Sequence, residues 1–196
     1  MSQNQNTASS IQKQAKILRV FRKIHRLTGI SLFVFLMLVS VTGLLLGWKK
    51  NSNDIILAKT YEGTAKDLAE WLPLHELSHN AQKIFRDSIS TEIETEIDRI
   101  DVRKEKGTAK FTFKNSFWGI QLDGATGEVL HIEKRRSDFI EKLHDGSIVD
   151  YYLGFSDGVF KLIYTTILGS ALMLFSITGF WLWYGPKRLR TIKKRA

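Results

Sequence analysis

Two histidines have surroundings that suit a cofactor. His25 is followed by a long uncharged stretch, and its basic neighbours are Arg22, Lys23 and Arg26. His144 precedes a second uncharged stretch. A neutral imidazole is a good axial ligand for haem iron, and cationic side chains form strong hydrogen bonds with carboxylates such as haem propionates. These residue types make His25 and His144 the predicted cofactor-binding residues, with haem as the candidate cofactor. The alternative is that His25 is an interfacial residue among cations and that His144 lies near the negative end of a helix dipole.

A second group of histidines has the spacing of a zinc motif. His75, Glu76 and His79 match the pattern H-E-x-x-H, which on a helix places two imidazoles one turn apart with a glutamate as a general base. Pro73 places this motif in the first turn of its predicted helix, and no second H-x-x-E-type element follows. Glu92, Glu94 and Glu96 are candidates for a third ligand only by their proximity in the sequence. We therefore predict no metal site here, and we assign His131 no role.

The chain has two long apolar stretches, and its charges are distributed around them. Residues 27–48 and 162–186 contain no charged side chain, and each is long enough for a helix that crosses the hydrocarbon core of a bilayer, which takes about 20 residues. All 20 acidic residues lie between Asp54 and Asp157, so the net charge of +9 comes from the two ends of the chain. A nucleic-acid-binding domain is excluded, because neither basic end is long enough to form one.

The basic residues also set the expected orientation. Cytoplasmic segments next to membrane spans are enriched in Lys and Arg. We therefore expect the protein to lie in a bacterial inner membrane with both termini on the cytoplasmic side. The predicted organisation is a basic tail (1–26), a transmembrane helix (27–48), an extracytoplasmic segment (49–160), a second transmembrane helix (161–185) and a second basic tail (186–196). We expect Gly185 and Pro186 to end the second helix.

The two spans contain an internal repeat. Residues 36–43 (LMLVSVTG) and 172–179 (LMLFSITG) are identical at six of eight positions. Because the chain crosses in opposite directions, the two repeats would be antiparallel. Small residues allow membrane helices to approach closely, so the repeats predict helix pairing, either within one chain or between two copies.

A homodimer would extend the haem hypothesis. His25 and His144 lie on opposite sides of the predicted membrane, so one haem cannot be bound by both in a monomer. A twofold dimer would bring together two copies of each histidine and allow one bis-histidine haem in each leaflet. The short cytoplasmic tails carry no flavin or nicotinamide site, so the electron donor would be another molecule, for which quinol is the candidate.

The central segment has the pattern of a small α+β domain. An apolar face recurs at helical spacing after Pro73, and four alternating stretches follow between residues 97 and 132. The residues Asp123–Glu128 form a turn signal between the last two of these stretches. We expect a helix that packs on an antiparallel meander, then a short helix at 137–144 and a glycine-rich connector at 146–158.

These features together resemble the PepSY-associated transmembrane family. The matching segments occur in the family's order over about residues 20–190, and they are His25–Gly29, Thr42–Gly43, Asp123–Glu128, Leu143–Gly146 and Thr178–Gly179. The resemblance implies an extracytoplasmic PepSY domain. It also implies a relationship to inner-membrane ferric-siderophore reductases, which bind haem b and have more spans than this chain.

Two functions follow from the residues and the resemblance. The first is a haem-binding component of transmembrane electron transfer that is linked to the reduction of iron or siderophores and acts as a homodimer or with a different partner in the membrane. The second is a non-catalytic envelope module that binds or regulates a partner such as a peptidase, since PepSY domains occur in peptidase propeptides. The chain has no cysteine, which excludes disulfides and covalent haem attachment, and it has no phosphate-binding loop and no serine nucleophile motif.

Overall fold

The computed structural model describes residues 2–92 and 94–194. The chain divides into two compact units. The helical unit contains the residues up to Ser40 and those from Phe155 onward, and the sheet unit contains Val41–Gly154. Helix α1, Ser2–Trp48, contributes to both units.

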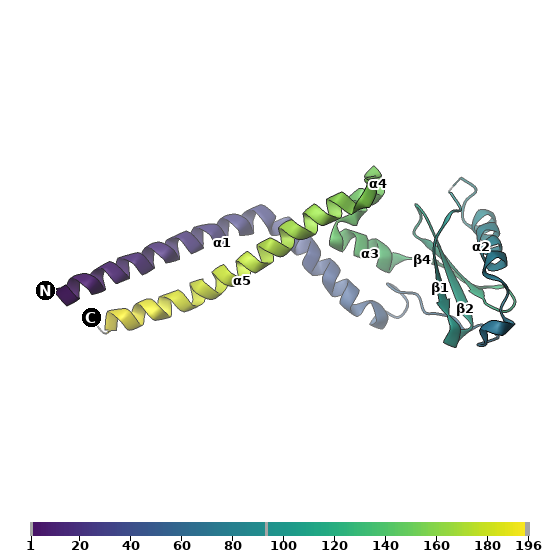
Figure 1. Ribbon diagram of the computed structural model, residues 1–196, viewed down its shortest axis with the longest axis horizontal. Helices are drawn as coiled ribbons and strands as arrows, with labels where there is room; N and C mark the ends of the chain where they lie inside the picture. The colour runs from purple at the N-terminus through teal and green to yellow at the C-terminus, as the bar shows by residue number, and fades with distance from the viewer. Residues whose placement is uncertain (1, 93, 195–196) are drawn as a thin grey trace. The chain divides into compact units, whose positions relative to one another are not determined.

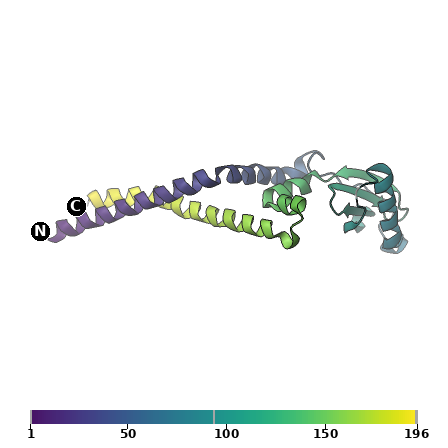
Figure 2. The same ribbon diagram turned by 90° about the horizontal axis from the view of Figure 1, so that it is seen from above.

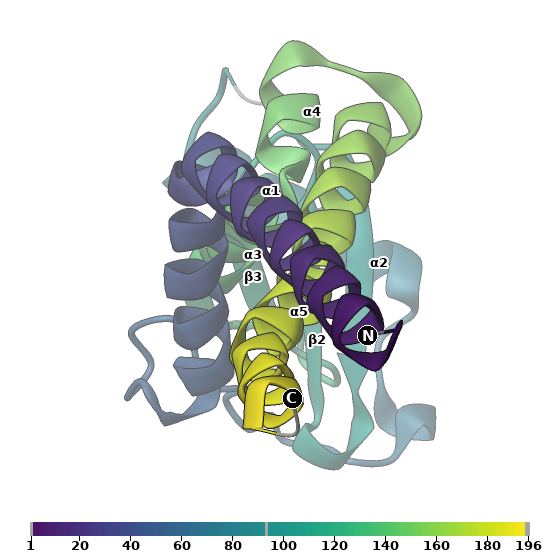
Figure 3. The same cartoon turned by 90° about the vertical axis from the view of Figure 1, so that its left-hand side faces the viewer.

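The helical unit is an antiparallel pair. Helix α5, Val159–Lys194, runs beside α1, so that the first residues of α1 and the last residues of α5 lie at the same end of the unit (Figures 1 and 2). Seen from that end, the two helices cross (Figure 3). The ring centroids of Phe21 and Trp181 are 5.8 Å apart in this contact. Both helices are long and apolar enough to cross a membrane, and most of their apolar side chains are not covered by protein. A bilayer would cover such surfaces.

The prediction that Gly185 and Pro186 end the second helix is wrong. Helix α5 continues through Pro186 to Lys194. Proline removes one helical hydrogen bond, but membrane helices tolerate this loss where neighbouring groups support the backbone. Here Gly185 packs against Leu18 of α1, because a Cβ added at residue 185 would lie only 2.5 Å from a methyl group of Leu18. In addition, Lys187 Nζ lies 3.7 Å from the centre of the Trp183 ring.

The sheet unit contains a four-stranded antiparallel meander. Its strands, in spatial order, are β1 (Ile97–Arg103), β2 (Thr108–Phe113), β3 (Trp118–Asp123) and β4 (Val129–Lys134). In the register of the sheet Phe111 lies opposite Ile100 on one side and Ile120 on the other. This pairing places large apolar residues of neighbouring strands side by side on one face of the sheet.

Helix α2, Leu74–Ser88, covers that face (Figure 1). Its buried residues Leu77, Ala81 and Phe85 recur every four positions and therefore share one side of the helix. They pack against the buried sheet residues Ala109, Phe111, Phe113, Ile120 and Leu122. The expected fold class is thus confirmed: two long apolar helices flank a small α+β domain.

Two short helices follow the sheet. Helix α3, Arg136–Asp145, begins directly after β4, and α4, Ser147–Leu153, occupies most of the segment that we expected to be a glycine-rich connector. Gly146 (φ 80°) and Gly154 (φ 68°) both have the left-handed conformation that ends helices. Gly146 and Gly154 therefore mark the two ends of α4. Glycine is common both at helix ends and in flexible connectors, so composition alone does not distinguish the two.

Asp123 organises the turn between β3 and β4. Its carboxylate is buried and accepts hydrogen bonds from the backbone N–H groups of Thr64 (2.8 Å) and Ala125 (2.8 Å), and from the Thr64 hydroxyl (3.1 Å). Burial by itself would raise the pKa of Asp123, but these hydrogen bonds stabilise the charged form and the pKa is lowered. Asp123 therefore links the segment that precedes α2 to the sheet.

We expect Asp123→Ala to destabilise the sheet unit by about 1–3 kcal/mol at neutral pH, because it removes the carboxylate that accepts the hydrogen bonds of Thr64 and Ala125. The pKa of Asp123 is lowered on folding, so its contribution is present above the unfolded-state pKa of about 3.9 and is lost as the pH falls through the folded-state value. Thermal unfolding of the detergent-solubilised protein, measured from pH 7 to pH 3, checks this. A stability difference between the two proteins that did not shrink in acid would contradict it.

Candidate functional site

His25 is held by the end of the repeat in α5. Its Nδ1 lies 2.7 Å from Oγ1 of Thr178, and its ring meets the Phe175 ring edge to face at 4.8 Å. Gly179, the next residue of the repeat, leaves room for the imidazole, since a Cβ built there would lie 3.9 Å from Cε1 of His25. The ring is half-buried, and Thr178 is buried. A threonine, a glycine and an aromatic ring together set the orientation of this imidazole.

The hydrogen bonds of Thr178 determine the tautomer of His25. The Thr178 hydroxyl donates to the carbonyl oxygen of Leu174 at 2.7 Å, so its single proton is already used. In this arrangement its oxygen accepts, and Nδ1 of His25 is assigned as the donor. In neutral His25 the lone pair is therefore on Nε2, and Nε2 has no hydrogen-bond partner among the residues that the structure describes. An imidazole in this state can bind a metal ion through Nε2.

His144 has the same kind of partner in the sheet unit. It lies in the last turn of α3, and its Nδ1 is 3.0 Å from Oγ1 of Thr42. Thr42 is buried, and it occupies the position in the first repeat that Thr178 occupies in the second. Gly43 again leaves the space, and a Cβ there would lie 3.3 Å from Cε1 of His144. Each Thr-Gly pair thus contacts one histidine.

The sequence predicted the repeat, but it did not predict that the Thr-Gly end of each repeat contacts a histidine. We expected the small residues to bring helix backbones together, whereas Gly43 and Gly179 face imidazole rings. The partners Thr42 and Thr178 were missed as site residues. A signal for them was present: a threonine followed by glycine ends both repeats, and the chain has one membrane-adjacent histidine for each.

The remaining histidines do not form comparable sites. His75, Glu76 and His79 are exposed at the start of α2, while Leu77 between them is buried in the core. Within residues 2–92 and 94–194, no cluster of three or more potential metal ligands is found. His131 stacks at 4.7 Å on the ring of Tyr61. The basic neighbours of His25 are exposed, so they are accessible to an anionic group.

These observations define the class: a membrane protein with two long apolar helices, an α+β domain between them in the chain, and two histidines held by a repeated Thr-Gly pair. The chain belongs to the family described as the PepSY-associated TM region, whose model matches residues 9–196. Searches of curated proteins and of solved structures returned no match. The family expected from the motifs is therefore confirmed over nearly the whole chain.

The Gly43 contact can be tested with a matched variant. We expect Gly43→Leu to displace His144, because a side chain at this position meets the imidazole, and to destabilise the protein by about 1–3 kcal/mol, as overpacking does. Gly47→Leu is the control, since a Cβ at Gly47 has no heavy atom within 4 Å. Thermal unfolding in detergent should show a lower Tm for the first variant only; equal melting temperatures would argue against the contact.

Proposed function

We propose that this protein is a haem b-binding component of transmembrane electron transfer, with His25 and His144 as axial ligands. The observation that supports the proposal most strongly is the hydrogen bond between Nδ1 of each histidine and the hydroxyl of a buried threonine. Metal-binding histidines are usually held through the nitrogen that does not bind the metal, which fixes the ring and raises its basicity. The donor set thus fits haem, which would supply one-electron redox chemistry.

A second copy of the chain would complete each site. Each threonine holds a single histidine, and bis-histidine ligation needs two. In a homodimer with a twofold axis along the membrane normal, the two copies of His25 would meet near one face of the bilayer and the two copies of His144 near the other. The exposed cations Arg22, Lys23 and Arg26 would bind the propionates on the His25 side.

The direction of transfer follows from the proposed topology. If both termini lie on the cytoplasmic side of a bacterial inner membrane, electrons would pass outward from the His25 site to the His144 site. A membrane quinol is the proposed donor, and iron in a chelated, siderophore-like form is the proposed acceptor. The relationship of the family to ferric-siderophore reductases supports that acceptor. The residues of this chain would bind and orient the cofactor at both positions.

The haem proposal predicts the spectrum of the purified protein. Protein from a haem-replete host should show a Soret band and reduced-minus-oxidised b-type bands. His25→Ala and His144→Ala should each lose about half of the band intensity, because each removes the axial ligands of one site. His131→Ala is the control and should retain the full spectrum. A colourless but folded wild type would exclude the proposal and favour the alternative of a partner-binding envelope module.

The threonines should act as positioning residues. Thr42→Val and Thr178→Val keep the shape of the side chain but remove the acceptor of the Nδ1 proton. We expect each variant to bind haem about 10-fold more weakly or worse, as is typical when the hydrogen-bond partner of a metal-binding histidine is lost. Each should also shift the midpoint potential of its own haem. Unchanged affinity and potential would show that the threonines serve packing alone.

The topology has its own test, because the chain has no cysteine. Single cysteines can be placed at Ser9, near the start of α1, and at Lys83, an exposed residue of α2. In spheroplasts a membrane-impermeant maleimide should label Lys83→Cys, whereas Ser9→Cys should react only after the membrane is permeabilised. The opposite pattern would reverse the proposed direction of electron transfer.

A further inference from the structure

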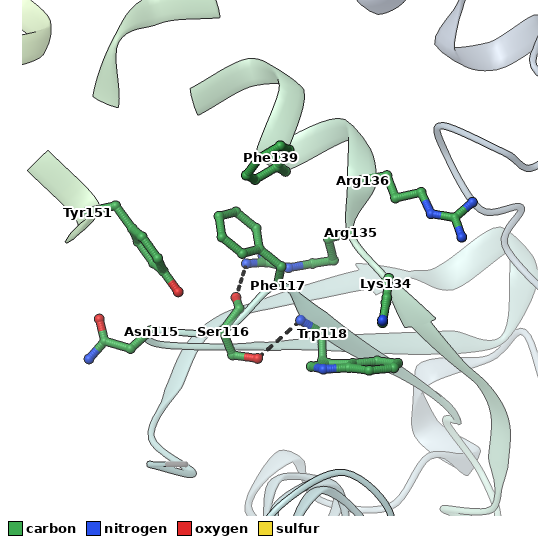
Figure 4. A pocket seen from close by; sticks show the side chains of 9 residues that line it. All are labelled: Asn115, Ser116, Phe117, Trp118, Lys134, Arg135, Arg136, Phe139 and Tyr151. Carbon is green, nitrogen blue, oxygen red and sulfur yellow. Dashed lines mark hydrogen bonds between the residues drawn. The ribbon is translucent and has the colours of Figure 1, made fainter. Parts of the chain in front are cut away.

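The sheet unit has a basic groove that the haem proposal does not use. It lies between the strands β3 and β4 and the helices α3 and α4, and the residues that line it are labelled in Figure 4. Its volume is about 380 Å³. A second hollow of about 240 Å³ continues from it and shares Asn115, Ser116, Arg135 and Tyr151. We call the two together the basic groove.

Three consecutive cations line the larger hollow, at the junction of β4 and α3. They are Lys134, Arg135 and Arg136, and none of the nine residues around this hollow is acidic. Arg135 is only 8% exposed and donates to the carbonyl oxygen of Ser116 at 2.9 Å. Its Nη1 pairs with Asp138 at 3.0 Å, and its Nε has no hydrogen-bond partner among the described residues. The charge of Arg135 is compensated by Asp138, so Lys134 and Arg136 supply the positive charge of the larger hollow.

Aromatic rings form the walls of the basic groove. Phe117 packs between Phe139 of α3 (5.4 Å) and Tyr151 of α4 (5.0 Å), and Lys134 Nζ lies 5.0 Å from the centre of the Trp118 ring. Burial raises the pKa of Tyr151, so its phenol stays protonated and can donate a hydrogen bond. The groove therefore combines cations, a neutral donor and apolar surface in one preformed cavity.

The sheet unit itself places this groove close to the bilayer. Helix α3 carries Arg136 and Phe139 near its beginning and His144 near its end, and His144 contacts Thr42 in the apolar part of α1. Ten residues of helix span about 15 Å at 1.5 Å per residue. The groove therefore lies no farther than about the length of α3 from Thr42, a residue of the proposed membrane span.

Exposed apolar residues lie beside the basic groove. Tyr152 and Leu153 follow Tyr151 on α4 and are 68% and 64% exposed, and Ile55, whose carbonyl oxygen accepts a hydrogen bond from Arg136, is 63% exposed. Aromatic and aliphatic residues at this level commonly insert into the interface of a bilayer. A membrane surface would therefore contact this side of the sheet unit.

We propose that the basic groove binds the headgroup of an anionic phospholipid of the adjacent leaflet. The phosphate oxygens would accept hydrogen bonds from Lys134 and Arg136, and the glycerol portion would contact the aromatic walls. The two hollows are lined by five basic residues and one acidic residue, Asp98, and this excess of positive charge selects an anion. The nearby exposed apolar residues favour a lipid over a free phosphate. This proposal rests on the two spans and is independent of whether haem binds.

Trp118 provides a local probe for the test. The full-length protein in detergent is labelled with 5-fluorotryptophan, and the Trp118 resonance, one of five, is assigned with Trp118→Phe. Titration with phosphatidylglycerol should shift this ¹⁹F resonance to saturation, whereas phosphatidylcholine should not. Lys134→Gln/Arg136→Gln should bind about 30-fold more weakly at low salt, since each basic residue near an anionic lipid contributes a factor of about five. Arg136→Gln alone leaves the Lys134–Trp118 contact intact and should bind about fivefold more weakly.

The control removes two charges elsewhere on the same unit. Lys83→Gln/Lys104→Gln lies outside the groove, and its titration should match that of the wild type. Equal binding by the groove variants and the wild type would overturn the proposal, as would an equal response to phosphatidylcholine. Glycerol 3-phosphate separates the two sources of phosphate: if it shifts Trp118 at the same concentrations as the lipid, the site binds a soluble anion and the lipid proposal is wrong.

Discussion

A buried polar group must find a hydrogen-bond partner, and this requirement governs the pairing of the buried residues Thr42 and Thr178 with the two histidines. A buried hydroxyl or imidazole nitrogen without a partner costs free energy. Thr178 meets the requirement for His25 because its own proton is donated to the preceding turn of α5 and its oxygen is left as an acceptor. The same pairing occurs between Thr42 and His144. The pairing that satisfies one ring nitrogen also fixes the direction of the other.

The two sites use one motif, but their histidines come from different kinds of element. His25 lies in a long membrane helix, whereas His144 lies at the end of a ten-residue helix that follows directly from β4. The position of His144 therefore depends on the sheet, on the β4–α3 junction and on the ion pair of Arg135 with Asp138. The sheet unit is thus a structural part of the second histidine site.

Most of the fold could be predicted from the sequence, because local patterns determine it. The alternating residues of β2 and β3 and the apolar face of α2 give the sheet, the helix and the side on which they meet. The continuation of α5 beyond Pro186 could not be predicted in this way, because it depends on packing against Leu18 of a helix distant in sequence. Helix α4 was missed because glycine marks helix ends and connectors alike. The threonine partners were missed because their role appears only when residues more than 100 positions apart are brought into contact.

Helix α3 connects the basic groove with the second histidine site, and this connection limits how the two can influence each other. A ligand shifts a conformational equilibrium only if it binds one state better than the other. The groove exists only while Phe139 of α3 and Tyr151 of α4 pack on Phe117, and that packing also determines where the far end of α3 lies. A headgroup in the groove would therefore favour the same placement of α3 that brings His144 to Thr42. The lipid surface would then act on the site through the position of one short helix, with no need for a change in the sheet.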